Sequence, residues 1–425
     1  MRWLARVLAL IAIVAIGYVV WAWRPSLPDA TAPTRAALNP ELIRKGAELA
    51  AFGNCAQCHT APKGKLYAGG RAVPTPFGVV WGPNITPDLE TGIGGYSKTA
   101  FIRAMRDGVD RRGRHLYPAF PYDHMAKMTE DDTVAVWAFL LTREPIRQSN
   151  PTTQLAFPLN QRMLLAGWKA LFLDRRAFAP DPNQSAAWNR GAYLVEGLAH
   201  CGACHTPRNV FGAEIKSAAY SGGQADGWNA PALNLNSPAA VPWTADRIEA
   251  YLRLGRDDLH GASAGPMNEV TQSLANVSAA DVAAIAIFVA HIAGNPTPER
   301  TAAALKKAAT QPPSGVQVSQ APGATVYAGA CAQCHGGNGR LPINPAVNLA
   351  LSSTARAPDP TNFFNVVRGG VHQPAGIAGS FMPGFAEILS EVQIRDVAAY
   401  VRESFAGQPA WSNLDAKPRR TSAGK

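Results

Sequence analysis

The pattern Cys-x-x-Cys-His occurs three times in this chain, at residues 55–59, 201–205 and 331–335. It is the attachment signature of c-type haem, in which two thiols bond the porphyrin and the adjacent histidine binds the iron. A zinc site or a thioredoxin-like dithiol is the alternative, but histidine follows the second cysteine directly each time. We therefore predict three covalent haem c groups. The attachment cysteines are Cys55, Cys58, Cys201, Cys204, Cys331 and Cys334, and the proximal iron ligands are His59, His205 and His335.

The cysteine count and the length support the same prediction. All six cysteines lie in the motifs, so none remains for a disulfide. At roughly 150 residues per domain, 425 residues allow one domain per motif. We expect a mainly α fold, with three tandem class I cytochrome c-like domains after an N-terminal hydrophobic helix. The predicted segments are an anchor or signal at 1–24, haem domains at 36–146, 187–296 and 323–407, a connector at 147–186, a linker at 297–322 and a tail at 408–425.

The sequence around each motif also repeats. A short helical segment precedes each motif, at residues 43–50, 189–195 and, more weakly, 324–329. Gly46 and Gly191 in these segments would allow a close helix–helix crossing. Each domain then ends in an apolar-periodic helix with a capping-box-like start. The N-cap residues are Thr129, Ser278 and Ser390, and the aromatic residues expected to pack against the first helix are Phe139, Phe288 and Tyr400.

A sixth iron ligand is expected on the loop before each C-terminal helix. An electron-transfer haem most often takes methionine there, which raises its reduction potential. Met267 and Met382 occupy this position in the second and third domains. Both could instead be core-filling side chains, but their position and type agree with the role of distal iron ligand.

The first domain departs from this pattern, because Phe120 stands where a methionine is expected. His124 and Met125 follow on the same loop. We favour His124 as the distal ligand of haem I, with Met125 as the alternative and an unligated or water-bound iron as the third possibility. Residues 81–87 are expected to wrap the edge of the same haem, with Arg71 or Trp81 at a propionate; the alternative is an ordinary surface loop.

The N-terminus predicts a location on the outer side of the bacterial inner membrane. Arg2 and Arg6 precede an apolar run at residues 7–23, which orients the rest of the chain outward. A small-residue cleavage site occurs only late, at residues 30–32, so we favour an uncleaved anchor over a cleaved signal. The net charge is +10. The scattered lysines and arginines argue against nucleic acid and favour acidic redox partners or anionic lipid, with an ordinary solvated surface as the equal alternative.

The remaining segments predict connections and packing. We interpret residues 163–172 as a segment that packs between domains, and residues 294–322 as a loose linker. We expect the tail after residue 408 to be poorly ordered. Five further histidines have no spacing that demands a ligand, and we interpret them as structural: His115, His200, His260, His291 and His372.

Residues 40–407 resemble the three-haem cytochrome c subunit of membrane-bound periplasmic dehydrogenases. The resemblance lies in Thr-Pro-Phe-Gly at 75–78, Asn-Ile-Thr-Pro-Asp at 84–88, Thr-Gly-Ile-Gly at 91–94, Leu-Tyr-Pro-Ala-Phe-Pro-Tyr at 116–122, and residues 188–197 and 200–209. It implies a subunit that takes electrons from a partner holding pyrroloquinoline quinone, flavin or molybdopterin. The electrons would pass on to ubiquinone or a terminal oxidase.

Two departures bear on the partner. Cytochromes paired with quinoprotein alcohol dehydrogenases typically have methionine at the position of Phe120, and residues 239–243 look more like those paired with molybdenum hydroxylases. The resemblance therefore favours a molybdopterin subunit with an iron–sulfur subunit, over a quinoprotein alcohol or flavin sugar dehydrogenase. No substrate-converting site is expected in this chain. The alternatives are a multihaem peroxidase, for which only haem I could offer an open iron, and a subunit of a terminal oxidase.

Overall fold

The structure is a computed structural model that describes residues 2–310, 322–337, 341–343, 347–371 and 382–414. The chain divides into two compact units, which are described separately. The first unit comprises Met1–Pro180 with the segments Glu196–His200 and Asn209–Ala213, and the second comprises Asp181–Val195, Cys201–Arg208 and Glu214–Lys425. Both units are built mainly from helices, as the sequence predicts, with only short strands among the described residues.

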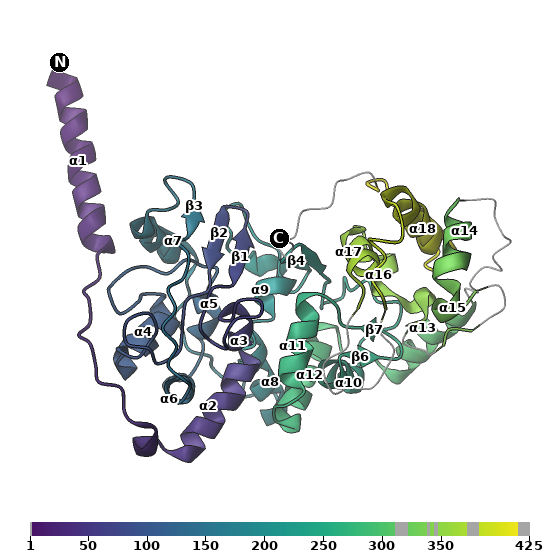
Figure 1. Cartoon of the computed structure of the whole chain (residues 1–425), viewed down its shortest axis with the longest axis horizontal. Coiled ribbons are helices and arrows are strands. Elements are labelled where there is room, and N and C mark those ends of the chain that lie inside the picture. The colour runs from purple at the N-terminus through teal and green to yellow at the C-terminus, as the bar shows by residue number, and fades with distance from the viewer. Residues whose placement is uncertain (1, 311–321, 338–340, 344–346, 372–381, 415–425) are drawn as a thin grey trace. The chain divides into compact units, whose positions relative to one another are not determined.

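The first unit begins with a long apolar helix and contains a small antiparallel sheet of order β1-β2-β3 (Figure 1). In this sheet Thr75 pairs with Gly78, and Gly78 also pairs with Leu155. The elements are α1 (Arg2–Ala22), η1 (Arg35–Ala37), α2 (Pro40–Phe52), α3 (Cys55–Cys58), β1 (Ala72–Thr75), β2 (Gly78–Trp81), α4 (Lys98–Asp107), α5 (Tyr122–Met125), α6 (Glu130–Leu141), β3 (Gln154–Leu155), η2 (Arg162–Leu164) and α7 (Leu165–Phe172).

The second unit contains the other two motifs and two short hairpins. Its elements are α8 (Ala186–Glu196), α9 (Gly202–His205), η3 (Lys216–Ala218), β4 (Gly223–Ala225), β5 (Trp228–Ala230), α10 (Ala245–Leu254), β6 (Arg256–Asp257), β7 (Gly261–Ala262), α11 (Pro266–Leu274), α12 (Ala279–Ile292), α13 (Pro298–Thr310), α14 (Pro322–Ala330), α15 (Ala332–His335), η5 (Leu349–Leu351), α16 (Ser353–Arg356), α17 (Thr361–Gly369) and α18 (Glu391–Ser404).

A glycine sets the same helix crossing beside each motif. A Cβ atom on Gly46 of α2 would lie 1.9 Å from a carbonyl oxygen of α6, and one on Gly191 of α8 would lie 1.9 Å from a carbonyl oxygen of α12. Both crossings were predicted from the sequence. The third crossing, of α14 and α18, uses Gly323 at 2.1 Å, whereas a Cβ on Gly329 would meet nothing within 4 Å. No side chain fits at the three contact positions.

The predicted caps and core aromatics of the C-terminal helices are confirmed. Thr129 and Ser278 accept hydrogen bonds from the N3 backbone amides of α6 and α12, and Ser390 forms a full capping box with Gln393. These contacts satisfy amides that the first helical turn leaves without intrahelical partners. The three aromatic residues are buried beside the glycine crossings: Phe139, Phe288 and Tyr400.

The described parts of two connecting segments are more ordered than the sequence predicts. The predicted loose linker contains the helix α13, because Pro298 occupies a helix start, where its missing N–H costs nothing, and alanines follow. The tail after residue 408, predicted to be poorly ordered, is packed at Trp411. Trp411 is buried, its Nε1 donates to the carbonyl of Ala357 at 2.8 Å, and the Arg402 guanidinium lies 4.3 Å from the centre of its ring.

Polar side chains join the second and third haem regions within the second unit. Asn362 of α17 accepts from the backbone amide of Asn229 in β5 and donates to its carbonyl, at 2.8 and 2.7 Å. The Asn229 side chain donates to Asp359 at 2.7 Å, and Asn365 donates to the carbonyl of Gly227 at 3.0 Å. These paired amide contacts hold α17 in a fixed position against β5.

The glycine crossing predicts a position-specific effect of one methyl group. We expect Gly191→Ala to lower the free energy of unfolding of the second unit by about 1–3 kcal/mol, because its methyl group would overlap the α12 backbone. Gly329→Ala is the matched control, since it adds the same group to a helix where space is open and alanine is the better helix former. Thermal unfolding followed by circular dichroism would measure both, and equal melting curves would contradict the account.

Candidate haem sites

Each motif histidine is oriented by one backbone carbonyl. Nδ1 of His59 lies 2.7 Å from the carbonyl oxygen of Pro83, Nδ1 of His205 lies 2.7 Å from that of Pro231, and Nδ1 of His335 lies 2.8 Å from that of Val347. A carbonyl only accepts, so Nδ1 carries the proton and donates it. The lone pair of Nε2 is then available to a metal, which is the orientation that iron-ligating histidines require.

The surroundings of these imidazoles favour the neutral form. It lowers the pKa of His59, His205 and His335 below the ordinary value, and the hydrogen bonds to the carbonyls only partly oppose this effect. Since a metal binds the neutral form of histidine, the local environment favours ligation.

The loops that supply the carbonyls pass close to the motifs. A Cβ on Gly82, directly before Pro83, would lie 1.8 Å from the carbonyl oxygen of Cys58. A Cβ on Gly223 would lie 2.3 Å from that of Cys204. In the segment predicted to wrap the edge of haem I, Gly82 lies against Cys58 and Pro83 supplies the carbonyl that accepts from His59. The carbonyl partners themselves were missed, because any residue type can supply a backbone oxygen.

The first cysteine of each motif does not readily lose its proton to form a thiolate. Burial, together with the neighbouring cysteine of the motif, raises the pKa of Cys55 and Cys201 to about 12 and that of Cys331 to about 11. Redox dithiols of the thioredoxin type have lowered pKa values instead. The environment of these thiols therefore argues against the dithiol alternative.

One buried donor beside the first motif fits a haem propionate. The indole Nε1 of Trp81 is buried, and among the described residues nothing accepts its hydrogen bond. Trp81 directly precedes Gly82, which abuts Cys58. Buried N–H groups in native proteins are almost always paired, so this orphan donor indicates an acceptor that the polypeptide does not supply. A propionate carboxylate has the chemistry of that acceptor.

The two predicted distal methionines lie on segments that pack within the second unit. Met382 packs, together with Cys331, against the buried core of the third domain, and its backbone pairs with Val371 in an antiparallel bridge. Met267 lies in the first turn of α11, which begins after Gly265. Gly265 packs on Trp228 of β5, the strand that leads directly to Pro231 and so to His205. Both side chains are half-buried.

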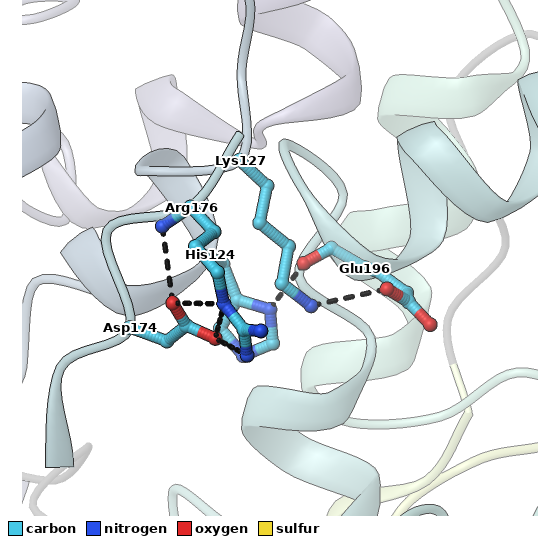
Figure 2. Close-up of polar contacts among 5 residues, drawn as sticks. All are labelled: His124, Lys127, Asp174, Arg176 and Glu196. Atoms are coloured by element: carbon cyan, nitrogen blue, oxygen red, sulfur yellow. Dashed lines mark hydrogen bonds and ion pairs between the residues drawn. The ribbon is translucent and has the colours of Figure 1, made fainter. Parts of the chain in front are cut away.

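The loop of the first domain places His124 in a different setting. His124 lies on α5, is buried, and donates from Nδ1 to the carbonyl oxygen of Glu196 at 2.7 Å (Figure 2). Lys127 forms an ion pair with the Glu196 carboxylate at 3.1 Å in the same view. An iron bond at His124 would therefore have to use Nε2. Met125 is also buried, so His124 and Met125 both remain candidate ligands of haem I.

The histidines interpreted as structural contact nearby groups of the polypeptide. His115 lies 2.8 Å from the carbonyl oxygen of Ala22, and His260 lies between Asp257 and the carbonyl of Val241. His200 lies 3.3 Å from the carbonyl of Gly53. The ring of His291 packs on Trp188. His372 lies outside the described residues.

Comparison with known proteins identifies the family. The cytochrome c family model matches residues 43–144 and 320–404. The fold, the motifs and this match define a c-type cytochrome with covalently bound haem c. A nicotinate dehydrogenase subunit of Pseudomonas putida is 44% identical over 94% of the chain, although the chain spans only 33% of that protein.

Two further relatives match over most of their length. The gluconate 2-dehydrogenase cytochrome c subunit of Pantoea cypripedii is 36% identical, with 89% of each chain covered. The alcohol dehydrogenase (quinone) cytochrome c subunit of Gluconacetobacter polyoxogenes is 35% identical, with 86% of this chain and 81% of the relative covered. The chain belongs to the family of electron-transferring cytochrome c subunits of dehydrogenase complexes.

The orphan indole predicts a shift in the reduction potential of haem I. We expect Trp81→Phe to lower this potential by up to about 40 mV, because a propionate without its donor carries a more exposed negative charge that disfavours the reduced haem; one hydrogen bond is worth about 1 kcal/mol. Trp137→Phe is the control, since its indole donates to the carbonyl of Tyr96 instead. A spectroelectrochemical titration measures both, and equal shifts would contradict a propionate contact.

Proposed function

We propose that the chain holds three haem c groups and relays single electrons along them. The three motifs would bond the haems through their cysteines, with His59, His205 and His335 as proximal ligands and Met267 and Met382 as distal ligands of the second and third haems. Each iron, when bound, supplies a one-electron couple whose potential depends on its axial ligands. The carbonyl that fixes each proximal imidazole is the observation that carries this proposal. The chain's own residues hold the proximal ligands in one orientation.

We propose a molybdopterin dehydrogenase with an iron–sulfur subunit as the electron donor. The support is the match to the nicotinate dehydrogenase relative over 94% of the chain, together with Phe120 in place of the expected methionine. An aldehyde or a nitrogen heterocycle would then be the substrate of the complex. The second candidate donor is a quinoprotein alcohol or flavin sugar dehydrogenase, which the gluconate and alcohol dehydrogenase relatives favour.

We also propose that the complex lies on the periplasmic side of the inner membrane and reduces ubiquinone or a terminal oxidase. The end of α1 supports an anchor that is not cleaved. Tyr18 donates to the carbonyl of Met163 at 3.0 Å, the carbonyl of Ala22 accepts from His115, and the amide of Leu27 donates to the carbonyl of Arg111 at 2.8 Å. A cleaved signal would leave these partners in the first haem domain without their contacts.

Co-purification would test the proposed partner. With a C-terminal tag on this chain and gentle solubilisation of the membrane, we expect a large molybdopterin subunit and a small iron–sulfur subunit to be recovered, as identified by mass spectrometry. Recovery of a quinoprotein or a flavoprotein instead would contradict the molybdopterin proposal and favour the second candidate.

The sixth ligand of haem I distinguishes an electron relay from a peroxidase, because a peroxidase needs an open iron position. If His124 binds the iron, the ferrous wild-type protein should not bind carbon monoxide rapidly. His124→Gln should then bind about one equivalent per chain, and Met125→Leu should behave as wild type. Stopped-flow absorption measures this binding, and haem content checks folding. Rapid carbon monoxide binding by the wild type would contradict a closed haem I and favour the peroxidase alternative.

A further inference from the structure

A cationic cavity lies in the first unit where α1 ends. Its volume is about 400 Å³, and its lining includes Trp21 and Arg24 at the end of α1. The other charged residues that line it are Arg103, Asp107, Lys169 and Arg175. Arg175 donates to Asp107 at 3.0 Å, which compensates one positive charge. The three other cations give the cavity an excess of positive charge.

Lys169 of α7 is the most buried of these cations, with 2% of its surface exposed. Its ammonium donates to the carbonyl oxygen of Gly108 and to Nδ1 of His115. His115 can accept there because its Nε2 donates to the carbonyl of Ala22. In the described part of the chain, no carboxylate lies within ion-pairing distance of Lys169.

The burial of Lys169 lowers the pKa of its ammonium group. Burial, with a smaller contribution from Arg175, lowers its pKa to about 7. An unpaired buried cation is unfavourable, and an anion close to it favours the charged form. The pKa shift therefore agrees with the geometry, which presents a cation without an anion.

Arg103 adds a buried donor without an acceptor in the described chain. Two of its guanidinium nitrogens donate to the carbonyls of Pro25 and Asp110, at 2.8 and 2.6 Å. Its Nε is buried and has no acceptor among the described residues. Guanidinium and ammonium groups together are the side chains that bind phosphate best.

The surroundings of the cavity indicate where an anion would come from. Helix α1 is exposed, and among the described residues it alone is long and apolar enough to cross a membrane. Trp21 and Trp23 at its end are suited to the membrane interface. Leu164 and Leu171, on the neighbouring η2–α7 segment, are exposed apolar side chains. With α1 in a bilayer, the cavity would lie at the level of the lipid headgroups.

We propose that this cavity binds the phosphate group of an anionic phospholipid from the periplasmic leaflet. Arg24, Arg103 and Lys169 supply the positive charge that Asp107 does not compensate, and the apolar side chains of η2–α7 contact the acyl chains. The inference goes beyond the electron relay and rests on the proposed retention of α1.

Native mass spectrometry of the full-length haem-loaded protein, released from detergent after mixing with equal amounts of phosphatidylglycerol and phosphatidylcholine, would test this proposal. We expect the wild type to retain one phosphatidylglycerol. Arg24→Gln and Arg103→Gln should each reduce the retained fraction by about tenfold, the effect of losing one charge-assisted hydrogen bond. Arg176→Gln is the matched control, because this neighbouring arginine is exposed and pairs with Asp174 outside the cavity (Figure 2).

The same experiment distinguishes the ways in which the proposal could fail. Equal retention of phosphatidylcholine, or equal loss in Arg176→Gln, would overturn a specific anionic site. Stabilisation by inorganic phosphate in a thermal shift assay, with no phosphatidylglycerol retained, would overturn the lipid as the source of the anion. The intact mass shows whether α1 is present, so cleavage of the anchor would be recognised separately. Unchanged haem absorption confirms that each variant is folded.

Discussion

The close approach of two helices beside each haem motif is the constraint on which the rest of the structure depends. A glycine on the first helix lets the backbone of the last helix approach to a distance that any side chain would prevent. The last helix can then bury its aromatic residue in the same contact. Because the Cys-x-x-Cys-His motif follows the first helix directly, the crossing fixes where the motif begins. The three crossings use Gly46, Gly191 and Gly323.

The loops after the motifs complete each site in similar but not identical ways. A backbone carbonyl holds each proximal histidine, and in the first two domains a glycine lets its loop pass against the second cysteine. The third domain reaches its carbonyl, on Val347, by a shorter path. The proposed distal ligands also differ, since Phe120 stands in the first domain where the other two have Met267 and Met382. Different axial ligands give different reduction potentials, which is what a directional relay needs.

The sequence predicted the parts of this account that depend on residue type. The motifs, the helix caps, the buried aromatics and the glycines Gly46 and Gly191 all carry a chemical signature. The carbonyl partners of the histidines do not, because a backbone oxygen has no residue identity. Gly323 was missed because it lies just before the segment that was read as helical. The packing of Trp411 and the contacts of α1 with Met163 and His115 depend on residues far apart in the chain, which a linear pattern does not reveal.

The haem content of the full chain tests the central claim most directly. The haem c of the purified protein can be determined from its alkaline pyridine spectrum, with the protein concentration from amino-acid analysis. The account predicts three equivalents of haem per chain, one for each oriented histidine. Two equivalents would contradict it, and would mean that one of the three sites is a cytochrome fold without its haem.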